Sequence, residues 1–130
     1  MIDASVLIEY ERGRLDLQEK LAGRGSEEFF LSVVTASELL HGVHRARDAS
    51  IRARRSALVE AVLDSFPLLP VDLPTARIHA QLGADLASGG IVIGPADLWL
   101  AAAAIAHGLS LVTGNVREFR RVAGLTVEQW

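Results

Sequence analysis

Apolar residues along this chain fall into two kinds of segment, short β-favouring runs and longer runs with helical spacing. We expect strands at residues 29–34, 68–71, 110–113 and 125–129, because each is a compact apolar run beside turn-forming residues. A further strand would hold only Met1 and Ile2. The helical segments that the pattern predicts are 5–10, 15–22, 35–47, 51–66, 74–87, 95–106 and 116–122.

The ends of two helices are clearly marked. Gly89-Gly90 follows the segment 74–87, and glycine is the usual residue after a helix. Pro95 occupies the first position of the next helix, where a missing N–H does no harm. Residues 98–106 are apolar on nearly every side, which predicts that this helix is buried over most of its surface.

Strands that alternate with helices along a chain form a mostly parallel sheet with helices on both faces. We therefore expect an α/β fold with a central sheet of four to five strands between helical layers. No repeat, low-complexity tract or linker interrupts the pattern, so residues 1–130 are expected to form one domain. Half of the residues are hydrophobic, which excludes a disordered chain.

Three features that the sequence lacks narrow the class of protein. The chain contains no cysteine, which excludes disulfides and every metal site built on cysteine. Its apolar stretch at 98–106 is far shorter than the roughly 20 residues that span a bilayer. The first residues also lack the basic start of a signal peptide. We therefore expect a soluble cytoplasmic protein that does not enter a membrane.

Charge is unevenly distributed, although the net charge is only −3. Five of the arginines form one cluster within eleven residues: Arg45, Arg47, Arg52, Arg54 and Arg55. Such a run is typical of a solvated helix face, but the planar guanidinium also suits phosphate and carboxylate groups. His41 and His44 precede the cluster, and for His41 we expect partial burial or contact with a substrate.

Four polar residues stand where an apolar, strand-like run gives way to a helix start. They are Asp3, Glu38, Asp97 and Asn115. Helix capping could explain each one separately. Asp3 and Asn115 would be N-caps, Glu38 would close a capping box with Thr35, and Asp97 would favour the helix dipole from the third position.

Taken together, the four junctions favour a metal site. The carboxyl ends of parallel strands meet at one edge of a sheet, where ligands and metals collect. Carboxylates that converge there repel one another unless a cation neutralises them. Such hard oxygen ligands suit Mg²⁺ or Mn²⁺. A bound ion of this kind lowers the pKa of its water and stabilises charge on a phosphoryl group.

The residues around these junctions resemble the four motifs of PIN-domain ribonucleases, in order and over essentially the entire chain. The matching segments are Asp3 to Glu9, Thr35 to Gly42, Gly94 to Ala102 and Leu111 to Phe119. Within that family the chain is most similar to the VapC-type toxins of bacterial type II toxin–antitoxin pairs. The resemblance implies a PIN-like three-layer α/β fold.

The same resemblance implies an endoribonuclease that uses Mg²⁺ or Mn²⁺ and leaves a 5′-phosphate and a 3′-hydroxyl. Asp3 and Asp97 match the principal metal-binding aspartates, and Glu38 matches the third acid, which would hold metal or orient the attacking water. Asn115 matches the fourth catalytic position and, being uncharged, should weaken any second metal. Thr113 matches a hydroxyl residue that orders the site.

The resemblance also implies partners: an RNA substrate, a cognate antitoxin whose peptide would cover the active-site groove, and a second copy in a homodimer. A catalytically weak or inactive module that acts by binding the antitoxin is the alternative. The Glu38-x-x-His41 spacing occurs in di-iron bundles, but the chain has no second motif of that kind. It has no phosphate-binding Gly-x-x-x-x-Gly-Lys loop either.

Overall fold

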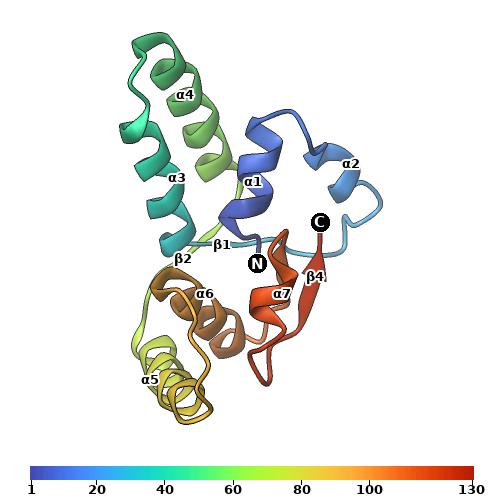
Figure 1. Ribbon diagram of the computed structural model, residues 1–130. Helices are drawn as coiled ribbons and strands as arrows, with labels where there is room; N and C mark the ends of the chain where they lie inside the picture. The colour runs from blue at the N-terminus through green and yellow to red at the C-terminus, as the bar shows by residue number, and fades with distance from the viewer.

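The computed structural model describes residues 1–130 as seven helices and four short strands. Figure 1 shows these elements and their labels. The helices are α1 (Ala4–Glu11), α2 (Leu17–Leu21), α3 (Val33–Arg45), α4 (Ala49–Ser65), α5 (Leu73–Ser88), α6 (Pro95–Ala106) and α7 (Val116–Phe119). The strands are β1 (Leu31–Ser32), β2 (Leu68–Leu69), β3 (Leu111–Thr113) and β4 (Val127–Gln129).

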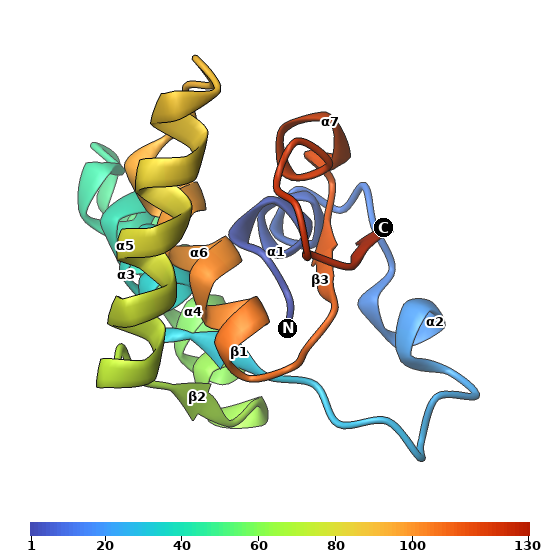
Figure 2. The same ribbon diagram turned by 90° about the horizontal axis from the view of Figure 1, so that it is seen from below.

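Every strand pairing is parallel. β1 pairs with β2, and β3 pairs with β4. The first residues of the chain join these two pairs, because Ile2 forms a parallel bridge with Val112 and donates its N–H to the carbonyl of Phe30 at 2.9 Å. Figure 2 shows this N-terminal segment between β1 and β3. The predicted parallel sheet with a very short first strand is therefore confirmed.

Side chains of the central strands alternate between two hydrophobic cores. Ile2 and Val112 belong to a core that includes residues of α1, α3 and α4, whereas Met1 and Leu111 belong to a core formed largely by α6. Successive side chains of a strand point to opposite faces of a sheet. Helices therefore cover both faces, and the result is the three-layer arrangement seen in Figure 1.

The apolar helix α6 is buried as its sequence predicts. Every residue from Leu100 to Ala104 is at most 2% exposed. α5 packs along α6, where the His79 ring stacks on the Trp99 ring with 3.6 Å between centroids. α6 thus lies between α5 and the sheet, which explains why its surface is apolar nearly all round.

The predicted start of α3 was wrong. We expected a strand through Val34 and a capping box from Thr35 to Glu38, but α3 already begins at Val33. Ser32 is the N-cap, and its hydroxyl accepts the Val34 N–H at 3.1 Å. A serine at the strand end offers a local cap that overrides the β preference of the two valines. Glu38 consequently lies in the second turn of α3.

The other helices match their predictions within a few residues. α4 begins at Ala49 because the Asp48 carboxylate caps the Ile51 N–H. α7 ends at Phe119, three residues earlier than expected, and β4 is two residues shorter than its predicted strand at its N-terminal end. None of the helices is both long enough and apolar enough to cross a membrane.

Candidate metal centre

Asp3 is held firmly at the point where the first strand ends and α1 begins. The residue is only 6% exposed. The hydroxyls of Ser5 and Thr113 both donate to its Oδ2 atom, at 2.7 and 2.6 Å. The protein provides no hydrogen-bond donor to Oδ1, so this oxygen is available to a cation.

The backbone of the turn between β3 and α7 holds the hydroxyls of Ser5 and Thr113 in position. The Gly114 N–H donates to Ser5 Oγ at 3.0 Å, and the Asn115 N–H donates to Thr113 Oγ1 at 2.9 Å. A hydroxyl donates one hydrogen bond and accepts others, so these bonds set the direction in which each proton points. A turn far along the chain therefore orients the Asp3 carboxylate.

Glu38 and Asp97 lie close enough to Asp3 for its negative charge to raise the pKa of both. Partial burial raises the pKa of Glu38 above its ordinary value, and the charges of Asp3 and Asp97 raise it further. Burial likewise raises the pKa of Asp97, with contributions from Asp3 and Glu118. The fold thus brings together the three acids that the sequence singled out from separate motifs.

Helix capping does not account for these residues. Asp3 and Asn115 stand at N-cap positions, but neither side chain makes a capping hydrogen bond. Glu38 is too far into α3 to close a capping box. Asp97 does occupy the third position of α6, where the helix dipole favours a carboxylate. Its pKa is nevertheless raised, so burial and repulsion outweigh that effect.

The acids fit a hard divalent cation that keeps much of its water. No three of the aspartate, glutamate and histidine side chains are grouped closely enough to enclose a metal by themselves. A closed four-ligand zinc site is therefore not formed. Mg²⁺ usually takes one or two carboxylates and retains several waters. The mutual repulsion at Glu38 and Asp97 is what such an ion would relieve.

Asn115 differs from the three acids. Its backbone is part of the Thr113 network, but its side chain is exposed and makes no hydrogen bond within the protein. The structure brings Asn115 to the same edge of the sheet through the β3–α7 turn.

Sequence reasoning missed two residues of this centre, Ser5 and Glu118. Ser5 follows Asp3 by two positions, a spacing that could have indicated a hydroxyl bonded to the carboxylate. Glu118 contributes to the raised pKa of Asp97 and forms an ion pair with Arg121. Arg121 also donates to the Val92 carbonyl at 2.8 Å, which joins the segment after α7 to the loop before α6.

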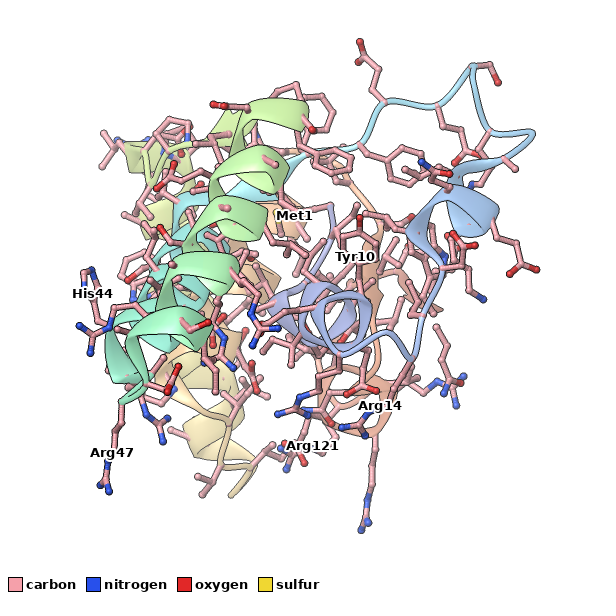
Figure 3. All side chains as sticks on the ribbon, turned by 90° about the horizontal axis from the view of Figure 1, so that it is seen from above. Met1, Tyr10, Arg14, His44, Arg47 and Arg121 are labelled. Atoms are coloured by element: carbon pink, nitrogen blue, oxygen red, sulfur yellow. The ribbon has the colours of Figure 1, made fainter.

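The arginine cluster divides into two groups. Arg52 donates to the Ala46 carbonyl, and Arg55 donates to the Gly42 carbonyl and to Glu11, so both stabilise the corner between α3 and α4. Arg47 and the preceding His44 point away from the molecule in Figure 3. The solvated-face interpretation therefore holds for part of the cluster.

The family model of the PIN domain matches residues 1–125. This chain belongs to the PIN domain family. Its relatives include Ribonuclease VapC1 of Rickettsia felis, which is 35% identical over 127 residues, 98% of this chain and 92% of that protein. The tRNA(fMet)-specific endonuclease VapC of Shigella flexneri is 36% identical over 100 residues, 77% of this chain and 74% of that protein. The PIN-domain chain is therefore a member of the VapC ribonucleases, as its motifs predicted.

Solved structures agree with this assignment. The crystal structure of DNA-bound VapBC from Salmonella typhimurium aligns with a TM-score of 0.90 and 30% identity, over 100% of this chain and 96% of that chain. VapBC2 from Rickettsia felis aligns with a TM-score of 0.89 at 22% identity, over 100% of this chain and 97% of that chain. The second likeness concerns the fold alone. Both confirm the PIN-type α/β fold.

Proposed function

We propose that this VapC-type protein is a toxin that cleaves RNA with Mg²⁺ or Mn²⁺ held by Asp3, Glu38 and Asp97. The observation that carries the proposal is the electrostatic coupling of these three acids at one edge of the sheet. Three mutually repelling carboxylates are stabilised by a divalent cation, and the hydroxyl network on Asp3 keeps one of them oriented for it.

In this proposal each residue has its own task. Asp3 presents Oδ1, while Ser5 and Thr113 prevent its carboxylate from rotating. Asp97 approaches from the first turn of α6. Glu38, with its raised pKa, holds the ion or orients the attacking water. A bound ion would supply an activated water and neutralise charge on the phosphodiester. Asn115 would contribute a neutral amide at the rim.

The experiment is an RNA cleavage assay on the purified protein with Mg²⁺, with Mn²⁺ and with a chelator. We expect cleavage with either metal, loss of cleavage with chelator, and loss of at least about 100-fold in Asp97→Asn. The matched control is Asp64→Asn, which makes the same change at an exposed carboxylate on α4. Equal cleavage by wild type and Asp97→Asn would exclude the proposed site.

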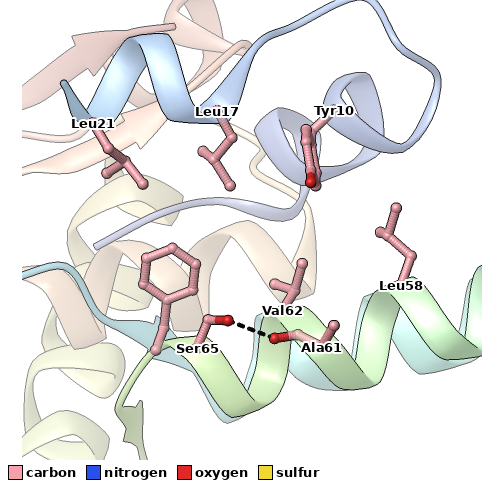
Figure 4. A pocket seen from close by; sticks show the side chains of 8 residues that line it. Tyr10, Leu17, Leu21, Leu58, Ala61, Val62 and Ser65 are labelled. Carbon is pink, nitrogen blue, oxygen red and sulfur yellow. Dashed lines mark hydrogen bonds between the residues drawn. The ribbon is translucent and has the colours of Figure 1, made fainter.

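We also propose an antitoxin as the partner of this chain, as in the VapBC complexes of its relatives. An apolar cavity of about 200 Å³ supports this part of the proposal. It lies between α2, the end of α1 and α4, and Tyr10, Leu17, Leu21, Leu58 and Val62 are among its lining residues (Figure 4). Apolar side chains of a partner would be buried there.

Since the RNA substrate would be cellular, we place the protein in the cytoplasm.

The proposed homodimer would use the exposed edge of the sheet. β2 is an edge strand, because it pairs only with β1. Around it Leu68, Val71 and Leu73 are 43, 44 and 61% exposed. Unpaired edges with exposed apolar residues favour association with another chain. A second copy that covered this edge would bury all three side chains.

A further inference from the structure

A polar cavity of about 610 Å³ opens beside the acidic centre, between α1 and α3. We refer to it as the α1–α3 cavity. Glu38 lines it together with His41 and Arg45 of α3, and Arg12 at the end of α1 lines the opposite side. Its volume lies within the range of ligand-binding pockets, which is about 300–1,000 Å³. Glu38 therefore belongs both to the acidic centre and to the cavity.

Three arginines and a second acid, Glu11, line the cavity besides Glu38, and the arginines differ in whether their guanidinium groups are already bound within the protein. Arg55 also lines it, but its guanidinium is bound to Glu11 at 2.6 Å and to the Gly42 carbonyl at 3.0 Å. Arg45 makes no hydrogen bond or ion pair with the protein. Arg12 has only an exposed partner, Glu9, at 3.4 Å. Exposed pairs of this kind contribute little, so Arg12 and Arg45 are available to a ligand.

The spacing along α3 sets the direction in which a ligand would lie. Glu38, His41 and Arg45 are separated by three and four residues, which places them on one face of the helix. With a rise of 1.5 Å per residue, Glu38 and Arg45 are about 10 Å apart along the axis. A phosphate bound by Arg45 is therefore not the phosphate at the acids. It belongs to a neighbouring part of the same strand.

We propose that the α1–α3 cavity binds the phosphate backbone of the RNA strand on one side of the bond that is cleaved. Arg12 and Arg45 contact phosphates, His41 donates from its ring between them and the acids, and Arg55 holds the cavity wall. This inference rests on the proposed ribonuclease function. The guanidinium fork matches phosphate oxygens, and the lining has few apolar residues, so the cavity suits an RNA strand better than an apolar helix.

The test measures binding of a short fluorescein-labelled single-stranded RNA by anisotropy at several salt concentrations, in the Asp97→Asn background so that the RNA stays intact. The variants are Arg12→Ala, Arg45→Ala and their combination. Arg47→Ala is the matched control, because it removes the same charge from an exposed arginine that does not line the cavity. Arg45→Lys keeps the charge but loses the fork.

We expect the double variant to bind RNA about tenfold more weakly, since hydrogen bonds to charged groups are lost. Each phosphate contact with a single strand contributes about 0.7 to the slope of log affinity against log salt, so the double variant should lower that slope by about 1.4. Arg45→Lys should keep most of the slope. A slope unchanged from that of Arg47→Ala would overturn the proposal.

Cleavage kinetics in the otherwise wild-type protein distinguish this inference from the function on which it rests. Arg45→Ala should raise KM and leave kcat nearly unchanged, because its contact is made equally before and during the reaction. If the wild type cleaves RNA but both arginine variants keep its KM, the cavity proposal alone fails. If the wild type does not cleave with either metal, the ribonuclease function fails. If the arginine variants bind RNA normally but no longer bind an antitoxin, the cavity is a binding site for the protein partner and the proposal is overturned.

Discussion

At the scale of single residues, the Asp3 carboxylate depends on two hydroxyls that leave it little freedom. Ser5 and Thr113 both donate to Oδ2, and the backbone of the β3–α7 turn orients both hydroxyls. Groups that hold a metal ligand in place typically change metal affinity or activity by about 10–100-fold when they are removed. Thr113 therefore matters for the proposed chemistry without itself binding the ion.

Thr113→Val should lower metal-dependent cleavage by about 10–100-fold and weaken metal binding, because Asp3 loses its shortest hydrogen bond. Titration of the protein with Mn²⁺ and the cleavage assay measure the two effects. Thr35→Val is the matched control. Thr35 is also fully buried, but its hydroxyl oxygen has no hydrogen-bond partner. Identical losses in both variants would show that Thr113 acts only through the fold.

The raised pKa values of Glu38 and Asp97 predict how metal and pH combine. A carboxyl whose pKa is raised by folding destabilises the folded protein at any pH at which the same carboxyl is ionised in the unfolded chain. This destabilisation disappears when the pH falls below the pKa of the carboxyl in the unfolded chain. The metal-free protein should therefore gain stability from Mg²⁺ at neutral pH and gain less as the pH falls through these raised values.

Thermal unfolding with and without Mg²⁺, repeated from neutral to acidic pH, measures this effect. Glu38→Gln removes one repelling charge, so it should raise the Tm of the metal-free protein at neutral pH while reducing the further increase that Mg²⁺ provides. An Mg²⁺ effect that grows on acidification would contradict the assignment of these acids to a cation site.

At the scale of elements, the corner between α3 and α4 shows why an arginine-rich run need not be a binding surface. Arg55 joins Glu11 of α1 to the Gly42 carbonyl of α3, and Arg52 binds the Ala46 carbonyl at the end of α3. These bonds hold α1, α3 and α4 around the core that also contains Leu39 and Val59. The corner is stabilised before any ligand arrives.

Arg55→Ala should lower the free energy of unfolding by about 1–2 kcal/mol, because a charge-assisted ion pair and a hydrogen bond to a carbonyl are lost together. Denaturant unfolding measures the change. Arg54→Ala, at an exposed neighbour that forms no ion pair, should change the free energy by less than about 0.5 kcal/mol. Equal effects of the two substitutions would assign the loss to net charge rather than to the corner.

At the scale of the whole molecule, the proposed metal centre and the proposed dimer interface involve different elements of the fold. Asp3 precedes α1, Glu38 lies in the second turn of α3 and Asp97 in the first turn of α6. The apolar residues of β2 and the loop that follows it lie at the sheet edge. A dimer that formed through this edge would leave the acids open. RNA binding and association would then be separable by mutation.

Leu73→Glu should shift the protein from dimer to monomer in light scattering after size exclusion. In the dimer the introduced carboxylate would be buried in the interface without a partner, which is unfavourable. In the monomer it would be at the first position of α5, where the helix dipole favours an acidic residue. Val92→Glu is the control, because Val92 is 83% exposed and lies outside the β2 edge. A dimer that survives Leu73→Glu would place the interface elsewhere.

Features decided by residues near one another in the chain could be predicted from the sequence, whereas features decided by distant residues could not. Burial of α6 was predicted because its own residues are apolar on every side. The start of α3 was predicted wrongly, because two plausible caps, Ser32 and Thr35, stand three residues apart and local pattern could not choose between them. Nothing in the local sequence indicated that Arg55 would be bound within the protein and Arg45 would not. Both arginines lie in segments predicted to be helices, within the same charged run.

The sequence by itself determined the order of the elements and the placement of Asp3, Asp97 and Asn115 at the starts of helices, because periodicity and helix signals are local properties. It placed Glu38 on the right helix but too near its start. Tertiary structure alone decided that three of these residues repel one another while the Asn115 side chain stays exposed. It also joined Asp3 to Thr113 across the parallel sheet. Those contacts depend on how distant segments pack against a shared core, and no residue's near neighbours in the chain encode them.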